Sequence, residues 1–270
     1  MRGVETDGGE EPGSGAETGG DVVGIDEAAS LWPDTLETEP PRPRKRRQRR
    51  LLVLLGAGLA ALALVAVAGP AIFFSIEGPA PKRLTLPVGP GGTVGPINGT
   101  WTVAGPSEVQ YRVAEILFGQ HHVAVGKTAK VQGGLTVKGA TVTSAHFSVD
   151  MASVRSGVAG RDSQFSGWIM DTASYPKGYF TLTKAIDLGK VPSERHIVDL
   201  DAVGKLVLRG KSRTVKFPLH AERYGDGLDV NGALTIHFGR WDIPNPSFTI
   251  TRVGNTGTID VLLHLVRKSA

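Results

Sequence analysis

Apolar residues at alternate positions dominate the second half of the chain, and this period of two most constrains its fold. Val109, Tyr111 and Val113 form one such apolar face. The same alternation recurs within residues 129–137, 145–151, 180–186, 198–208, 215–219, 228–238 and 259–265. Because successive side chains of a strand point to opposite faces, each segment predicts a half-buried strand. Seven to nine such strands, separated by glycine-containing turns, predict an all-β barrel or sandwich.

One stretch interrupts this alternation. The pattern of the strand that ends near Met151 breaks between Ser153 and Gly157. Phe165, Trp168 and Ile169 then follow the i, i+3, i+4 spacing of one helix face. Pro176 and Gly178 end this piece before the period of two restarts. The sequence therefore predicts a short helical segment, opened by Arg161-Asp162, between two strands.

This interruption and two flanking motifs resemble the YceI-like family of lipid-binding barrels. The matching residues are Ser153-Val154, Gly157, Arg161-Asp162, Asp171, Tyr175-Pro176 and Phe180, the hairpin sequence of residues 204–215, and Trp101 with His121-His122 and Gly133-Gly134. The resemblance covers roughly residues 99–268. It implies an antiparallel, eight-stranded, lipocalin-like barrel with a short helical segment. It also implies a ligand among the polyisoprenoid, quinone-like or fatty-acyl lipids.

An eight-stranded barrel is just wide enough to be filled by its own side chains or to hold one small ligand. We expect an apolar tunnel, because several inward positions, among them Ala129, Ala145, Ala202 and Gly204, are small. Each buried methylene of a lipid tail contributes about 0.8 kcal/mol to binding. The predicted ligand-binding residues are Tyr111, Val113, Phe147, Val149, Val154, Phe165, Trp168, Ile169, Phe180, Leu182, Leu206, Leu208, Phe217, Leu219, Leu234, Ile236 and Phe238.

Arg155 and Arg161 are the candidates for binding an anionic lipid head group at the tunnel mouth. The alternative for Arg161-Asp162 is a purely structural one, in which the aspartate favours the start of a helix and the arginine pairs locally. Both interpretations stay open at this stage.

The sequence offers little for catalysis. The chain has no cysteine, which excludes thiolate nucleophiles, disulfides and cysteine-ligated metals. His121 and His122 are adjacent, so on a strand they point to opposite faces and cannot chelate one ion. Neither Ser153 nor Ser163 lies in a G-x-S-x-G motif, and the carboxylates are scattered. We therefore predict a binding protein without catalytic residues, metal or cofactor.

The N-terminal part has a different character. Residues 1–41 hold eleven acidic residues and one basic residue, Arg2, with few apolar ones, which predicts a disordered tail. Residues 42–50 hold seven basic residues and no acid. The next 26 residues, 51–76, carry no charge, and about 20 apolar residues suffice to cross a bilayer. A nucleic-acid role for the basic run is therefore set aside in favour of a juxtamembrane one.

The positive-inside rule orients this segment with the tail in the cytoplasm and the later residues outside. A cleaved signal peptide is the alternative, since Val65-Ala66-Val67-Ala68 offers a small-residue site, but the apolar run exceeds the usual length. Residues 77–98 are rich in Pro and Gly and predict an extended linker. The composition, rich in Gly, Ala, Val and Arg, is typical of bacterial proteins from GC-rich genomes.

Together these features predict a single-pass plasma-membrane protein that presents a barrel outside the cytoplasm, at residues 99–268, and binds or carries an amphiphilic lipid. The alternative is a sensor of lipids or drugs that signals through its cytoplasmic tail. The lipid and the protein's own transmembrane helix are the expected partners, nucleic acid is not, and a homodimer stays open.

Overall fold

The computed structural model describes residues 44–87, 94–189, 196–248 and 251–268. The predicted acidic tail lies outside the described residues.

Helix α1 (Arg44–Glu77) contains the uncharged run that the sequence singles out. Its span from Lys45 to Gly69 has a mean hydropathy of 2.7, and its length and composition suffice for a membrane crossing. At 1.5 Å per residue these 25 residues extend about 37 Å, against a hydrocarbon core of about 30 Å. Large apolar side chains such as Leu54 and Val67 are exposed along it. The helix is consistent with a single-pass membrane anchor.

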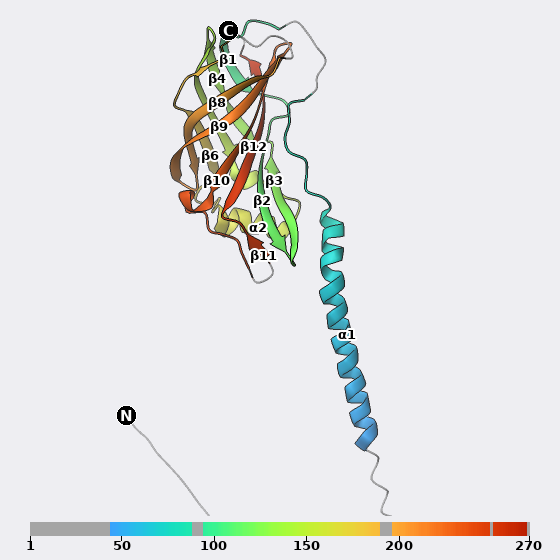
Figure 1. The fold of residues 1–270 in the computed structure, drawn as a ribbon. Helices are drawn as coiled ribbons and strands as arrows, with labels where there is room; N and C mark the ends of the chain where they lie inside the picture. The colour runs from blue at the N-terminus through green and yellow to red at the C-terminus, as the bar shows by residue number, and fades with distance from the viewer. Residues whose placement is uncertain (1–43, 88–93, 190–195, 249–250, 269–270) are drawn as a thin grey trace, which may run out of the picture. The chain divides into compact units, whose positions relative to one another are not determined.

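The rest of the described chain forms twelve strands and four short helical pieces (Figure 1). The strands are β1 (Gly99–Val103), β2 (Glu108–Leu117), β3 (Gln120–Thr128), β4 (Val131–Lys138), β5 (Thr141–Asp150), β6 (Lys177–Leu182), β7 (Ile186–Asp187), β8 (Val198–Leu208), β9 (Lys211–Tyr224), β10 (Gly227–His237), β11 (Thr251–Val253) and β12 (Thr256–Arg267). The helical pieces are η1 (Met151–Ser153), α2 (Ala159–Gln164), η2 (Phe165–Ile169) and η3 (Phe238–Trp241).

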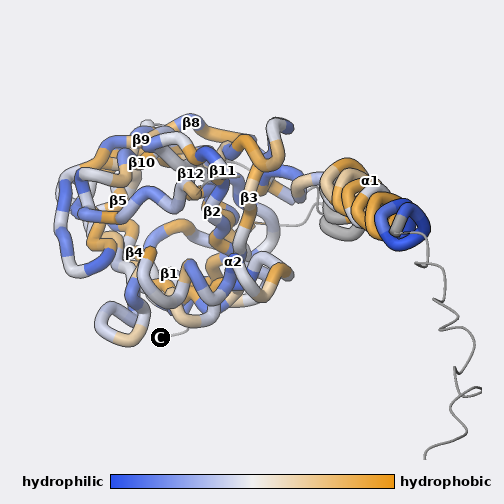
Figure 2. Tube along the Cα trace, turned by 90° about the horizontal axis from the view of Figure 1, so that it is seen from below, coloured by the Kyte–Doolittle hydropathy of each residue, from blue (hydrophilic) through white to orange (hydrophobic). Residues whose placement is uncertain are grey.

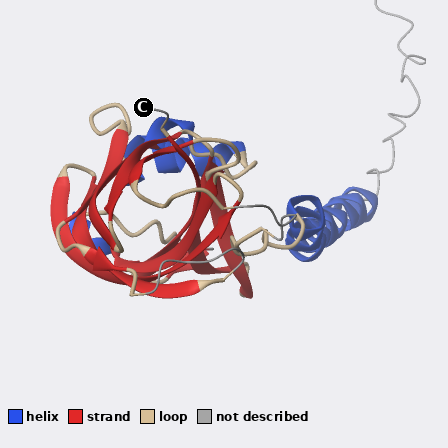
Figure 3. Cartoon of the chain, turned by 90° about the horizontal axis from the view of Figure 1, so that it is seen from above, coloured by secondary structure: helices blue, strands red, loops and turns tan. Residues whose placement is uncertain are grey.

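Eight antiparallel strands form a closed barrel in the order β1-β4-β5-β6-β8-β9-β10-β12, and pairing of β1 with β12 closes the ring (Figure 3). The predicted eight-stranded barrel is thus confirmed. Strand β2 continues the course of β1 along β12 and forms a hairpin with β3. The chain segment from η1 to η2 lies between β5 and β6, as the broken alternation predicts.

The two ends of the barrel differ. One end carries β1 and the end of β12, and the other carries α2, η3 and β11 (Figures 1 and 2). We call them the Trp101 end and the α2 end. Each has its own group of buried apolar residues, one including Trp101, Val137 and Leu265 and the other including Phe165 and Trp241.

The linker contributes to the barrel wall. The side chain of Arg112 donates to the carbonyl of Pro81 at 2.7 Å, and Asn231 donates to that of Leu84 at 2.8 Å. Between them Arg83 lies 3.2 Å from Asp260, whose side chain is only 2% exposed. Residues 81–84 thus cross the outer faces of β2, β12 and β10, and we call them the strap.

Candidate functional site

A cavity of about 480 Å³ occupies the barrel interior. This size lies within the roughly 300–1,000 Å³ of typical small-molecule sites. Its wall is almost entirely aliphatic and aromatic, with side chains from nearly every strand and from the α2–η2 segment. Sixteen of the predicted ligand-binding residues line it: Tyr111, Val113, Phe147, Val149, Val154, Phe165, Ile169, Phe180, Leu182, Leu206, Leu208, Phe217, Leu219, Leu234, Ile236 and Phe238.

Small residues shape this interior in two ways. Ala145 and Ala202 line the cavity and leave room in it. Gly204 and Gly232 instead make room for neighbours, since a β-carbon would lie 2.5 Å from the Phe180 ring or from Leu219. Ala129 is exposed and contributes nothing to the interior, contrary to the sequence prediction. It follows Thr128, the last residue of β3, so the alternation does not extend to it.

Trp168 is the one predicted ligand-binding residue that does not line the cavity. Its side chain is 42% exposed and meets the Phe248 ring edge-on at 6.0 Å. The helix changes here to a wider turn, in which Met170 donates to the carbonyl five residues earlier, and Gly167 has a non-helical ψ of −106°. This turn rotates Trp168 away from the face that Phe165 and Ile169 share, so the prediction from regular helical spacing is wrong.

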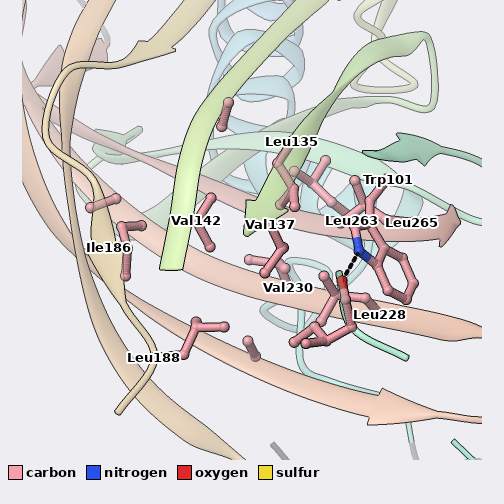
Figure 4. Close-up of a cluster of buried hydrophobic side chains, with 14 of the residues drawn as sticks. Trp101, Leu135, Val137, Val142, Ile186, Leu188, Leu228, Val230, Leu263 and Leu265 are labelled. Carbon is pink, nitrogen blue, oxygen red and sulfur yellow. Dashed lines mark hydrogen bonds between the residues drawn. The ribbon is translucent and has the colours of Figure 1, made fainter. Parts of the chain in front are cut away.

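The cavity is closed at the Trp101 end. The Trp101 side chain is buried there, and its indole N–H donates to the carbonyl of Ile97 at 2.8 Å (Figure 4). The guanidinium of Arg223 lies over the indole, 6.0 Å from the ring centroid. Burial lowers the pKa of Arg223. Leu265 and Val137 complete this closed end.

Polar groups enter the cavity wall at the α2 end. Glu115, Arg161 and Gln164 line the cavity there. Arg161 lies 3.3 Å from the Glu115 carboxylate, and the Nδ1 atom of His122 lies 3.0 Å from the same carboxylate. Arg155 does not line the cavity; its guanidinium donates to the carbonyls of Ala152 and Val154. Of the two arginines predicted to bind a head group, only Arg161 is placed to do so.

Sequence reasoning missed Glu115, although a signal for it exists. In β2, Val113, Glu115 and Leu117 occupy alternate positions, so the period of two places the carboxylate on the inward face. Pairing with β3 sets Glu115 opposite His122, which makes the two side chains neighbours.

The α2 end also carries basic residues around its edge. Asp242 follows η3, and the side chain of Lys211 lies 3.0 Å from its carboxylate. Lys211 first, and then the charges of Arg213 and Arg209, lower the pKa of Asp242. Arg240 lies over the Trp241 ring at 5.4 Å. Three basic side chains thus surround one carboxylate at this edge.

Other polar pairs lie away from the cavity. His264 lies 2.7 Å from the Asp229 carboxylate and 3.0 Å from the Tyr224 hydroxyl. Burial raises the pKa of Asp229, and the hydrogen bond from His264 opposes this shift. His122 and His264 are therefore both paired with carboxylates. Within the described ranges, no group of three His, Asp or Glu side chains could hold a metal ion.

Comparison with known proteins places this geometry in a family. A family model described as the YceI-like domain matches residues 101–265. A polyisoprenoid-binding domain from Saccharophagus degradans, implicated in plant cell wall breakdown, is similar in structure, with a TM-score of 0.51 and 16% identity over 62% of this chain and 98% of that one. This likeness supports the fold.

Two further solved structures resemble the chain more distantly. They are BcnA of Burkholderia cenocepacia (TM-score 0.45, 21% identity, 58% of this chain and 96% of that one) and a YceI protein of Campylobacter jejuni (TM-score 0.45, 14% identity, 53% and 85%). A search of curated proteins found no match. Because the family model covers more than half of the chain, the protein belongs to the YceI-like family.

Proposed function

We propose that this protein binds or carries one long-chain amphiphilic lipid, of the polyisoprenoid, quinone-like or fatty-acyl class, inside its barrel. The observation that carries this proposal is the apolar cavity of about 480 Å³ with polar groups at one end only. A lipid tail gains about 0.8 kcal/mol for each methylene that leaves water, without any specific polar contact. Binding rather than catalysis is the proposed role.

The polar end favours an uncharged head group. The carboxylate of Glu115 offsets the charge of Arg161, and the two side chains provide an acceptor and donors next to each other. A hydroxyl or carbonyl head can bond to these groups without leaving a net charge in a partly buried site. A phosphate would face the Glu115 carboxylate. The structural arrangement thus favours a quinone-like or alcohol head over the anionic head considered from sequence.

The proposed location is the plasma membrane, with α1 as the anchor and the barrel outside the cytoplasm. Seven basic residues precede the apolar run, and positive flanks stay on the cytoplasmic side. The same rule gives the N-terminal tail a cytoplasmic location.

A matched pair of variants on β5 tests the lipid proposal. Ala145 lines the cavity, whereas its neighbour Ser144 is exposed on the outer face. The full chain would be purified in detergent, and native mass spectrometry would detect any lipid that stays bound after the detergent is removed. The bound lipid would be identified in an organic extract of the protein. Wild type and Ser144→Phe should retain a lipid, and Ala145→Phe should lose it while keeping the circular dichroism spectrum. A lipid-free wild type, or equal retention by both variants, contradicts the proposal.

A further inference from the structure

The α2 end exposes three large aromatic side chains around the cavity mouth. They come from three separate segments: Phe118 from the β2–β3 turn, Trp168 from η2 and Phe248 from the loop before β11. Their exposed fractions are 40%, 42% and 51%. Phe248 lines the cavity as well. We call these three residues the aromatic rim.

The backbone holds these segments together. Thr251 of β11 pairs with Leu117 of β2, which precedes Phe118. The amide of Phe248 donates to the carbonyl of Thr251 at 2.8 Å, and Trp168 contacts the Phe248 ring. The three aromatic residues therefore lie on segments that are paired or in contact at this end of the barrel.

Phe118 occupies its position against local preference. The β2–β3 turn consists of Phe118 and Gly119, with φ angles of 51° and 80°. A two-residue turn of this kind favours Asn or Asp followed by Gly, because other side chains are strained at positive φ. The Phe118 side chain nevertheless stays 40% exposed. Backbone strain of this kind clusters at functional sites.

Basic residues are exposed at the same end of the barrel as the aromatic rim. Lys211, Arg213, Arg240 and Arg252 are exposed at the same end, with Arg252 next to Thr251 in β11. We call these four the rim bases. Aromatic and basic side chains exposed at the same end of the barrel fit the boundary between head groups and acyl chains of an anionic bilayer.

We propose that the aromatic rim and the rim bases dock the cavity mouth directly on an anionic lipid bilayer. This inference rests on the proposed lipid-binding function and specifies where the lipid passes. The short linker supports a bilayer as the binding partner of this surface. Residues 78–80 alone join the end of α1 to the strap, which is already bonded to the barrel at Pro81. Three residues span at most about 11 Å, so a barrel tethered to a membrane-spanning α1 stays at that membrane surface.

The absence of cysteine allows a direct test with single labels. A thiol-reactive, environment-sensitive fluorophore would be attached to Gln120→Cys, beside the aromatic rim, or to Lys138→Cys, the last residue of β4 at the Trp101 end. The full chain would be reconstituted in phosphatidylcholine vesicles with or without phosphatidylglycerol, each containing nitroxide-labelled lipid as quencher. Docking predicts strong quenching of the label at 120 in the anionic vesicles and little quenching of the label at 138. Equal quenching of the two labels, or a label at 120 that stays unquenched, overturns the proposal.

A charge variant separates docking from lipid binding. Arg213 and Arg252 do not line the cavity, so Arg213→Gln/Arg252→Gln leaves its wall intact. The loss of two charges should weaken docking on anionic vesicles by roughly 30-fold. Lipid retained in the native mass spectrum should not change. In the chain that keeps both arginines, retained lipid together with an unquenched label at 120 refutes docking alone, whereas quenching without any retained lipid refutes the lipid-binding function alone.

Discussion

Arg161 of α2 and Glu115 of β2 form an ion pair of 3.3 Å at the polar end of the cavity, and both side chains are mostly buried. The pair joins the helical segment to the strand beneath it. It also sets the charge that a head group meets. Replacement of one partner therefore changes the net charge of a partly buried site.

Glu115→Gln should shift the head-group preference. The variant leaves the Arg161 guanidinium without its carboxylate, so a pyrophosphate-headed polyprenyl lipid should gain at least about tenfold in affinity relative to the corresponding alcohol. Competition between the two lipids, read by native mass spectrometry of the full chain, measures the ratio. The control is Glu108→Gln on the same strand, whose carboxylate pairs with Lys127 and does not line the cavity. An unchanged ratio in Glu115→Gln contradicts the proposed role of this pair.

Gly133→Ala should destabilise the barrel. Gly133 has a φ of 127°, and a β-carbon there would lie 2.1 Å from the backbone oxygen of His146 on the paired strand. The strain and the forced separation of β4 and β5 should cost about 3 kcal/mol or more in unfolding free energy. Gly139 provides the comparison, since it has a φ of 61° but no atom within 4 Å of the added β-carbon.

Gly139→Ala should lower the unfolding free energy by only about 1–2 kcal/mol, because alanine is strained at positive φ but meets no neighbouring atom there. Urea unfolding of both variants in detergent micelles, followed by tryptophan fluorescence, gives the two values. Equal losses would show that the close approach at Gly133 adds nothing.

Asp229→Asn should change how stability depends on pH. Burial raises the pKa of Asp229 above its ordinary value of 3.8, so the folded protein holds this proton more tightly than the unfolded chain does. The stability from Asp229 is therefore fully present below pH 3.8 and is lost as the pH rises through the raised pKa. Asparagine does not titrate and keeps an oxygen for His264.

The unfolding free energy of Asp229→Asn minus that of wild type should therefore increase as the pH rises above 3.8, and then become constant. Urea midpoints measured at half-unit steps of pH would follow this difference. Parallel curves over the whole range would show that Asp229 does not couple folding to protons.

Asn231→Ala should loosen the strap. The variant removes the hydrogen bond to the Leu84 carbonyl, which contributes about 1 kcal/mol. Lys82 and Arg83 are trypsin sites within the strap, so cleavage there should become about fivefold faster. Gel analysis of the full chain in micelles gives the rate, and cleavage within the basic run of residues 44–50 of the same molecules is the internal reference. An unchanged rate in the strap would mean that Asn231 does not hold it.

The sequence predicted the strands and the inner face of the barrel well, because each strand buries one face. Phe147, Phe180 and Phe217 were assigned to the interior by alternation alone, and the register of the sheet places them there. The helical segment between β5 and β6 was predicted from its broken period. Trp168 was placed wrongly, since a regular helical spacing cannot foresee the wider turn at Gly167.

Contacts between residues distant in sequence could not be predicted from the alternation of apolar and polar residues. Arg83 and Asp260 are 177 positions apart, and nothing local marks Asp260 as the buried partner of a linker residue. The pair of His264 with Asp229 likewise depends on the register of β10 and β12. Alternation assigns Asp229, Asp260 and His264 to the outer face and cannot tell which outer positions another segment covers.

Because Trp101 closes one end of the barrel, the cavity can be entered only from the opposite end. The proposed lipid would therefore enter with its tail first and leave by the same end of the barrel. A second lipid molecule could not displace the bound one through the far end. Exchange of the proposed lipid would then be dissociative, with a rate that does not rise with the concentration of the competing lipid.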